Sequence, residues 1–443
     1  MARVRAFARR ERLFRRVSRV LVAVSGGPDS MATAALLQRL GTELGFEVVA
    51  CHFDHKLREG SREEQQRVRS LCEGLGLSCI TGEGDVAAMA ADTALGVEEA
   101  ARRMRYQFLA FAAGKERADV VATGHTADDQ AETVLHHIIR GSGVRGIRGM
   151  LPRSPLPHAE AQVLIRPLLF MERRDTEQIC MAAGIEPVLD PSNEEMEYTR
   201  NRIRHLALPA LAKLNPEVRS ALVRLSESAR EAFDSIEKAA MVTQPEHRTA
   251  IGATFSLGML SELPAEALSM VIEREAAAAQ LRFDVNATRL KNLRRVLDGG
   301  GGLVQFGDAI VEASNKHVRI GPELEEPQLF EPVVLNVPGV TRAGRYRVEV
   351  ASETRPGWQA VAEPAGVLRA RIAATGDRVR RPDREVRLTR LLAGARIPRW
   401  DSAGLLVVTD GPSVVAIPSI EPPVVPEPAE PALWLRAVRI DSS

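Results

Sequence analysis

Short apolar runs alternate with longer amphipathic stretches over the first half of the chain. Residues Val20–Val24 form a continuous apolar run, the pattern of a strand that is covered on both faces. Further strands are expected at 46–53, 77–80, 119–123 and 163–169, and helices at 30–44, 61–74, 96–115, 128–139 and 172–184. Because strands joined by helices of this length form right-handed crossovers, the pattern predicts a doubly wound α/β domain with a parallel sheet.

The pattern changes in the second half of the chain. Pro152, Pro155 and Pro157 predict a loop before the last strand of the α/β domain. From 217 to about 297 the periodicity is mainly helical, and 303–320 is typical of a hairpin. Short strands are expected at Tyr346–Ala351 and Leu405–Thr409, beyond a Pro-rich linker. The expected organisation is a catalytic α/β domain over 1–216, a mainly helical domain over 217–325 and a small α+β domain over 333–443.

Positive charge is unevenly distributed, although the formal net charge is only +1. Arginine concentrates in residues 1–20, around 198–205 and across 369–399. Such patches favour a polyanionic partner, and the alternative is a set of solvated faces in an arginine-rich chain. No apolar run approaches the ~20 residues of a membrane helix, so no membrane association is expected. The basic N-terminal segment predicts a solvated helix rather than a transit peptide, because it runs directly into the first strand.

The chain has four cysteines, Cys51, Cys72, Cys79 and Cys180, and no two are spaced as C-x-x-C. This spacing argues against a zinc ribbon, an iron–sulfur cluster and a disulfide scaffold. Reduced thiols and a cytoplasmic location are therefore expected.

A glycine-rich loop between the first strand and the first helix carries the main chemical signal. Glycine allows close approach of the backbone to a ligand, and the free N–H groups of a helix start attract anions. The serine hydroxyls can donate to phosphate oxygens, and Asp29 is placed to hold Mg²⁺. No Walker sequence is present, and an ordinary capped turn is the alternative interpretation. The predicted ATP-binding residues of the loop are Ser25, Gly26, Gly27, Pro28, Asp29 and Ser30.

This loop resembles that of the PP-loop superfamily, the N-type ATP pyrophosphatases. The resemblance implies cleavage of ATP between the α- and β-phosphates and adenylation of an oxygen, so that a nucleophile can displace AMP.

Several further segments, in order, are similar to those of the tRNA(Ile)-lysidine synthetase family. They cover about residues 20–216, with a weaker likeness over 376–418. The resemblance implies ATP-dependent adenylation of the wobble cytidine of a CAU-anticodon tRNA(Ile), followed by attack of free L-lysine to give lysidine. The segments are 52–58, 98–106, 123–133, 140–143, 165–169, 190–193 and 200–204.

Three acidic residues, Asp128, Asp129 and Glu132, stand at the start of a predicted helix. Asp129 and Glu132 share one helix face at i, i+3, and paired carboxylates suit binding an ammonium group and taking a proton from it. The alternative is that these acids only complement the helix dipole. By resemblance, Asp129 and Glu132 bind lysine and Asp129 is the base.

Basic residues in the similar segments have implied roles of their own. By resemblance Arg105 reaches the phosphates or the adenylated base, where a guanidinium suits developing charge. His52 and His55 lack a third metal ligand at a suitable spacing, so adenosine contacts are expected, with a structural role as the alternative.

Arginines in two regions are predicted to contact tRNA phosphates. Arg200 and Arg202 stand at a predicted helix start and could instead pair with Asp190 or Glu194. The others belong to the arginine-rich C-terminal segment and are Arg378, Arg380, Arg381 and Arg387.

One position departs from the family pattern, because Thr126 stands where the family commonly has histidine. Three alternatives stay open: a tRNA thiolase of the same superfamily, a small-molecule amidotransferase or synthetase, and a non-catalytic RNA-binding protein. The missing cysteine pair argues against the first, and the basic C-terminal region against the second. The intact acids argue against the third. The sequence leaves the oligomeric state open, with a homodimer as one alternative.

Overall fold

The computed structural model describes residues 1–56, 61–93, 96–188, 199–381, 384–402, 404–420 and 423–440. The chain forms two compact units, Met1–Asp234 and Ser235–Ser443. Residues 57–58 and 190–193 of the family-like segments, together with Glu194, lie outside the described residues. Within the described part of the chain, no helix is both long and apolar enough to cross a membrane.

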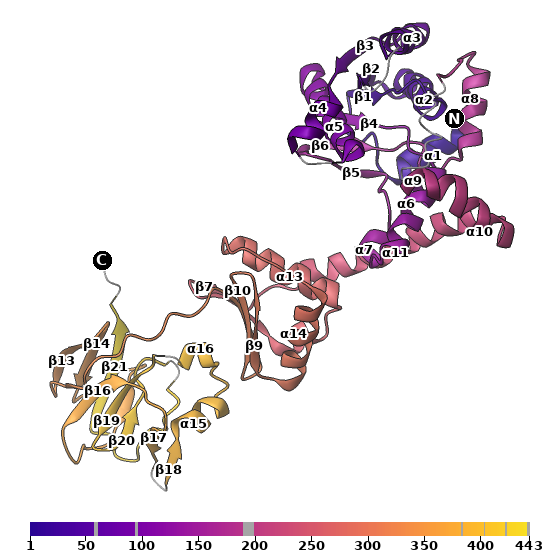
Figure 1. The fold of residues 1–443 in the computed structure, drawn as a ribbon. Helices are drawn as coiled ribbons and strands as arrows, with labels where there is room; N and C mark the ends of the chain where they lie inside the picture. The colour runs from indigo at the N-terminus through magenta and orange to yellow at the C-terminus, as the bar shows by residue number, and fades with distance from the viewer. Residues whose placement is uncertain are drawn as a thin grey trace. The chain divides into compact units, whose positions relative to one another are not determined.

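The first unit is built on a six-stranded sheet in the order β3-β2-β1-β4-β6-β5 (Figure 1). Neighbouring strands are parallel except β5, which is antiparallel to β6. The predicted parallel α/β sheet is therefore confirmed. The loop predicted from three prolines is wrong in part, because β5 contains Pro155, which an edge strand tolerates. The strands are β1 (Arg19–Ala23), β2 (Glu47–Asp54), β3 (Cys79–Glu83), β4 (Val120–Ala122), β5 (Arg153–Leu156) and β6 (Ala159–Ile165).

Helices cover both faces of this sheet, as the continuous apolar strand predicts. Val20 and Val22 of β1 join a core with helices α1, α2, α3 and α8, whereas Leu21 packs in a second core with α5. The helices are α1 (Ala2–Arg10), α2 (Pro28–Leu44), α3 (Ser61–Gly74), α4 (Val86–Thr93), α5 (Val97–Glu116), α6 (Ala127–Ile139), α7 (Val144–Ile147), α8 (Arg173–Ala182), α9 (Thr199–Arg202), the π-helix η2 (Ile203–Ala207), α10 (Leu208–Leu214) and α11 (Val218–Val242).

The second unit begins with a five-stranded antiparallel sheet in the order β7-β8-β11-β10-β9. Strands β7 and β8 were not expected in the mainly helical segment, since they have only three and five residues. The turn between them ends at Gly252, the first residue of β8, whose φ is +122°. A shared core joins this sheet to its helices. The elements are β7 (His247–Thr249), β8 (Gly252–Ser256), α12 (Leu257–Ser261), α13 (Ala265–Ala278), α14 (Ala287–Gly299), β9 (Gly302–Phe306), β10 (Ala309–Ser314) and β11 (His317–Gly321).

The C-terminal part of the second unit is a pair of sheets, β12-β16-β19-β20-β17-β18 and β13-β14-β21-β15, with a common apolar core. The expected strands at 346–351 and 405–409 are confirmed as β14 and β19. The elements are β12 (Val333–Val334), β13 (Gly339–Ala343), β14 (Tyr346–Ala351), β15 (Gln359–Val361), β16 (Leu368–Ile372), β17 (Arg378–Arg380), β18 (Glu385–Arg387), α15 (Leu388–Gly394), α16 (Arg399–Ser402), β19 (Leu406–Asp410), β20 (Ser413–Ala416) and β21 (Leu433–Arg439).

Candidate active site and arginine cavity

The glycine-rich loop leaves the end of β1 and enters α2, with Gly27 as N-cap and Pro28 as the first helical residue. Inside the loop, the Ser30 hydroxyl donates to the Gly27 carbonyl at 2.9 Å and accepts from the Ser25 amide at 3.1 Å. Gly26 has φ +84°, and a Cβ there would lie 2.8 Å from the Val68 side chain. The loop is thus held as a tight turn whose first helical N–H groups are available to an anion.

The end of β4 packs directly against this loop. A Cβ on Gly124 would lie 2.7 Å from the Asp29 carbonyl oxygen, so only glycine permits the approach. Helix α6, which carries the acidic residues, begins at Ala127, three residues after this contact. The close packing therefore brings the start of α6 to the phosphate loop.

Asp29 is held by two side chains of α8. The Thr176 hydroxyl donates to Asp29 Oδ1, and Arg173 Nε donates to Oδ2 at 3.3 Å. Burial raises the pKa of Asp29 above its ordinary value, against the Thr176 hydrogen bond and the Arg173 charge, which lower it. A carboxylate beside a phosphate loop fits the one protein ligand that Mg²⁺ often takes alongside substrate phosphates. In the described chain, no three His, Cys, Asp or Glu side chains come together as a separate metal site.

Asp129 and Glu132 lie on one face of α6 and are almost completely buried, with exposed fractions of 7% and 2%. The amide and hydroxyl of Thr126 donate to Asp129 Oδ2 at 2.9 and 3.0 Å. Burial alone would raise the pKa of Asp129, but the charge of Arg200 and the Thr126 amide help to hold it below its ordinary value. Asp129 is therefore a fixed, ionised carboxylate.

The third acid of the helix start, Asp128, has a different environment. It accepts a hydrogen bond from the Arg173 amide at 2.8 Å and pairs with Arg219 at 3.3 Å.

Two arginines from the α9–η2 segment meet the buried acids. Arg200 bonds Glu132 at 2.9 Å and Asp129 at 2.8 Å. Arg204 bonds both oxygens of Glu132, at 2.6 and 2.9 Å. Arg200 was expected to contact tRNA or to pair with acids that lie outside the described residues; here it pairs with the predicted lysine site. Arg202 is exposed.

A single guanidinium connects the phosphate loop to the buried acids. Arg173 lies 3.3 Å from Asp29 and 3.9 Å from Asp129, measured from its Nε and Nη2 atoms to the nearest carboxylate oxygens. The two predicted binding regions are therefore adjacent parts of one site at the carboxyl edge of the parallel sheet, where ligands of open α/β sheets bind.

The remaining predicted site residues lie near this edge with different surroundings. Arg105 is half-buried, and burial lowers its pKa, as does the nearby charge of Arg200. The charge of Arg105 in turn helps to lower the pKa of His125. His125, for which no role was predicted, lies in the same region: burial lowers its pKa to about 3, and its Nδ1 lies 2.8 Å from the Thr123 hydroxyl. His52 Nδ1 lies 2.9 Å from the Val24 carbonyl oxygen, a contact that anchors the end of β1.

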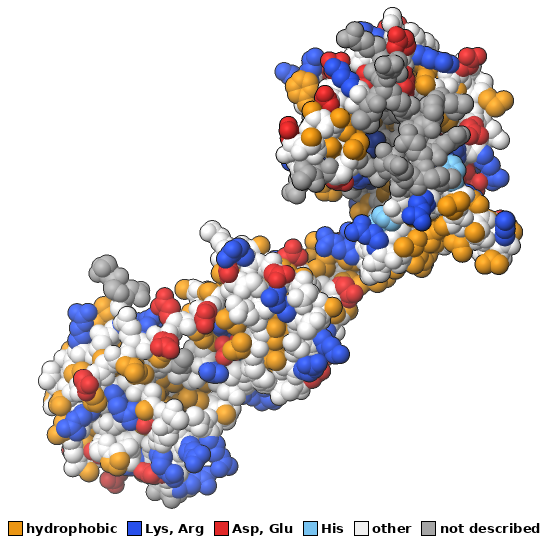
Figure 2. Space-filling view, in the orientation of Figure 1, with side chains coloured by type: hydrophobic (Ala, Val, Ile, Leu, Met, Phe, Trp, Pro, Cys, Tyr) orange, Lys and Arg blue, Asp and Glu red, His pale blue; other side chains and the backbone are white. Residues whose placement is uncertain are grey.

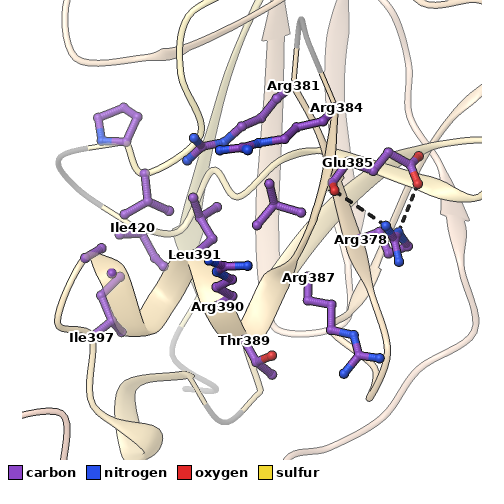
Figure 3. A pocket seen from close by; sticks show the side chains of 15 residues that line it. Arg378, Arg381, Arg384, Glu385, Arg387, Thr389, Arg390, Leu391, Ile397 and Ile420 are labelled. Atoms are coloured by element: carbon purple, nitrogen blue, oxygen red, sulfur yellow. Dashed lines mark hydrogen bonds and ion pairs between the residues drawn. The ribbon is translucent and has the colours of Figure 1, made fainter.

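The arginines predicted to bind tRNA in the C-terminal part of the second unit, here called the C-terminal module (residues 333–440), lie at or near a cavity of about 1210 Å³. Figure 2 shows Lys and Arg side chains gathered where Figure 1 places β17 and β18. Figure 3 shows Arg381 beside Arg384, and their backbones are hydrogen-bonded at 2.9 Å. Apolar residues, including Leu391 and Ile397, form another part of the wall. The arginines that line the cavity are Arg378, Arg381, Arg384, Arg387 and Arg390.

The predicted tRNA-binding arginines of this module fall into two groups. Arg378 pairs with Glu385 and Arg380 with Asp410, each at 3.1 Å. Arg381 and Arg387 line the cavity, whereas Arg380 does not. Arg378 and Arg380 thus form ion pairs within the protein, whereas Arg381 and Arg387 are identified by their place on the cavity wall.

Three residues of α8 and η2 that bond the acids of the active site had no predicted role. Arg204 is four positions after Arg200, so the i, i+4 spacing already placed both on one helix face. Arg173 and Thr176 had no such signal, because they meet Asp29 only through the packing of α8 against α2.

Comparisons with known proteins identify the family. A family model described as a PP-loop domain matches residues 3–211. The tRNA(Ile)-lysidine synthase of Geobacillus kaustophilus is 38% identical over 268 residues, 59% of this chain and 56% of the relative. That of Thermosipho africanus is 41% identical over 50% of each chain. The matched regions thus span about half the length of these two relatives.

A longer match extends into the second unit. The tRNA(Ile)-lysidine synthase of Dehalococcoides mccartyi is 30% identical over 368 residues, covering 80% of this chain and 76% of the relative. Among solved structures, the U34-tRNA thiolase of Methanococcus maripaludis has a TM-score of 0.43 and 19% identity over 52% of this chain and 78% of its own. The family match and the long alignment together place the chain in the tRNA(Ile)-lysidine synthase family.

Proposed function

We propose that this chain catalyses lysidine formation on a tRNA(Ile) with a CAU anticodon. The carbonyl oxygen at C2 of the wobble cytidine attacks the α-phosphate of ATP and releases pyrophosphate. The ε-amino group of free L-lysine then attacks C2 and expels AMP. A cytoplasmic location accompanies this proposal, since ATP, lysine and tRNA are all present there.

The observation that carries the proposal is the short path from Asp29 to Asp129 through Arg173. An adenylating enzyme that uses an amine nucleophile needs an anion site and an ammonium site within reach of one reacting atom. A phosphate loop next to two buried acids has this arrangement. A simple nucleotide-binding turn has no need of buried carboxylates at that distance.

Each side chain has a role that fits its surroundings. Residues 25–30 would hold the pyrophosphate portion of ATP, and Asp29 would hold Mg²⁺, which neutralises phosphate charge. Asp129 and Glu132 would bind the lysine ammonium, and Asp129, already ionised, would accept its proton. Arg105 would stabilise negative charge that develops on the phosphate. His52 and His55 are assigned to the adenosine side of the site.

The arginine cavity supports a polyanionic substrate. Arg381 and Arg387 stand on its wall, and phosphate contacts of this kind position RNA without reading its sequence. Arg202, which is exposed, is assigned a similar role near the active site.

The thiolase alternative requires a reactive cysteine near the nucleotide. Cys180 is close to the loop, with its Sγ donating to the Pro28 carbonyl at 3.4 Å. However, burial raises the pKa of Cys180 to about 11, whereas a nucleophilic thiol needs a lowered pKa. The environment of Cys180 therefore argues against its acting as the nucleophile of a sulfur transfer.

The test is incubation of the protein with ATP, isotope-labelled lysine and a tRNA(Ile) transcript, followed by nucleoside mass analysis. The expected product is cytidine plus lysine minus water, with AMP and pyrophosphate in equal amounts. A transcript with uridine in place of the wobble cytidine is the matched control and should stay unlabelled. A sulfur-containing nucleoside would support the thiolase alternative, and binding without modification would support a non-catalytic RNA-binding protein.

A further inference from the structure

The carboxylate oxygens that would receive the lysine ammonium are already bonded within the protein. Asp129 Oδ2 accepts from Thr126, and Oδ1 accepts from Arg200. Glu132 Oε1 accepts from Arg204, and Oε2 accepts from both Arg200 and Arg204. Asp129 Oδ1 and Glu132 Oε1 each accept one short hydrogen bond, from Arg200 and Arg204 respectively, so an incoming ammonium competes with these guanidiniums for the same carboxylate oxygens.

The two arginines differ in how they contact the acids and in how exposed they are. Arg200 makes one hydrogen bond to each acid, and 38% of its side chain is exposed. Arg204 makes two hydrogen bonds to Glu132 and a weak contact to Asp129 at 3.5 Å, and its side chain is 17% exposed. Arg200 is thus shared between the two acids and is partly solvated, whereas Arg204 makes its short bonds to Glu132 alone and is less exposed.

Charge balance favours an exchange of one arginine for one ammonium. Asp29, Asp129 and Glu132 are matched by the guanidiniums of Arg173, Arg200 and Arg204. If the ammonium entered while all three arginines stayed, the cluster would gain a buried positive charge. If the ammonium replaced one arginine, the balance would be preserved.

We propose that Arg200 is the exchangeable occupant of the lysine-ammonium position and that Arg204 is the permanent counter-ion of Glu132. This inference rests on the proposed function. Lysine binding swings the Arg200 guanidinium out toward solvent, while Arg204 keeps the Glu132 carboxylate oriented. The backbone at this point supports such a movement, since α9 continues into the π-helix Ile203–Ala207, and π-turns often occur at functional positions. The exchange also makes the site selective for lysine over small amines. A small amine makes no further contacts with the site, so it cannot offset the loss of the ion pairs between Arg200 and the two acids.

The two arginines should respond in opposite directions when neutralised. Labelled lysine is bound to the full chain by equilibrium dialysis without tRNA, so RNA contacts play no part. Arg200→Gln should tighten lysine binding about threefold to tenfold, because the competitor is removed. Arg204→Gln should weaken it by tenfold or more. Lys213→Gln, an exposed charge change on α10, is the control and should match wild type.

Arg200→Lys keeps the charge but loses the two-point contact, so its affinity for lysine should lie between those of wild type and Arg200→Gln. This variant still tests the proposal if Arg200→Gln folds poorly. Weakened binding in both Arg200 variants would overturn the proposal and make Arg200 a structural counter-ion. Lysidine formation by wild type is measured in parallel. Absence of lysidine rejects the proposed function, whereas normal lysidine formation with unchanged lysine affinity in Arg200→Gln rejects the exchange alone.

Discussion

Thr126 donates both its amide and its hydroxyl to one oxygen of Asp129, Oδ2, at 2.9 and 3.0 Å. The residue is fully buried and is the N-cap of α6. This arrangement leaves the other oxygen, Oδ1, to face Arg200. The threonine that departs from the common family pattern thus orients the proposed base.

Thr126→Val should lower the rate of lysine transfer more than the rate of ATP use, because Asp129 loses its hydroxyl donor. Loss of the N-cap should also cost about 1 kcal/mol of stability. Thr126→Ser, which retains the hydroxyl, is the control and should restore both. The measurements are single-turnover lysidine formation and the free energy of unfolding. Equal lysine-transfer rates in the valine and serine variants would show that the hydroxyl has no positioning role.

Asp29→Asn should abolish pyrophosphate release while tRNA affinity stays close to wild type. The amide cannot hold Mg²⁺ as a carboxylate does. Asp29 belongs to the first unit, whereas the arginines of the cavity belong to the second. Pyrophosphate release and tRNA filter binding measure the two effects. Asp175→Asn on α8 is the control. Wild-type turnover in the Asp29 variant would remove this residue from the site.

Glu132→Gln should raise the KM for lysine by roughly tenfold to a hundredfold, the range expected when a charge-assisted hydrogen bond is removed. The KM for ATP should change much less, since Glu132 contacts Arg200 and Arg204 rather than the phosphate loop. Glu227→Gln, an exposed substitution on α11, is the control. An unchanged KM for lysine would place the amine elsewhere.

Charge removal in the arginine cavity should weaken tRNA binding and reduce its salt dependence. Arg381, Arg384 and Arg387 are replaced together by Gln, and the slope of log affinity against log salt should fall by about one for each arginine–phosphate pair that is removed. Substitution is preferable to truncation, because β21 pairs with both β14 and β15 and its loss would open the module.

The control for this experiment carries the same charge change elsewhere in the module. Arg342, Arg369 and Arg439 are exposed and are replaced together by Gln. If both triple variants flatten the salt dependence equally, the cavity has no special part in binding and the arginines act as a general positive surface.

Stability should fall on acidification through His125. Burial lowers its pKa to about 3 from an ordinary 6.5, so the folded chain binds fewer protons than the unfolded chain between these values. The contribution is fully present above pH 6.5 and declines toward pH 3. His125→Gln should reduce the loss of unfolding free energy between pH 7 and pH 5, whereas His247→Gln, on an exposed position, should not. The same pH dependence in His125→Gln and wild type would contradict this assignment.

The local sequence pattern determined the first strand of the sheet and the helix face that carries the two buried acids. The apolar run at residues 20–24 predicted a strand covered on both faces, and β1 does send alternate side chains to two cores. The i, i+3 spacing of Asp129 and Glu132 predicted that their carboxylates share a helix face, which they do, as both contact Arg200. These features depend on periodicity and steric rules within one element, so they can be read from neighbouring residues.

The tertiary structure decided which cations meet which acids. The sequence contains 59 Lys and Arg residues, and nothing local distinguishes Arg173 as the partner of Asp29, 144 positions away. That pairing follows from the packing of α8 against α2. The same holds for Arg200, whose charge pattern was equally compatible with RNA contact. Ion pairing between distant elements depends on how the chain closes its loops and buries its faces, and only the folded chain fixes these distances.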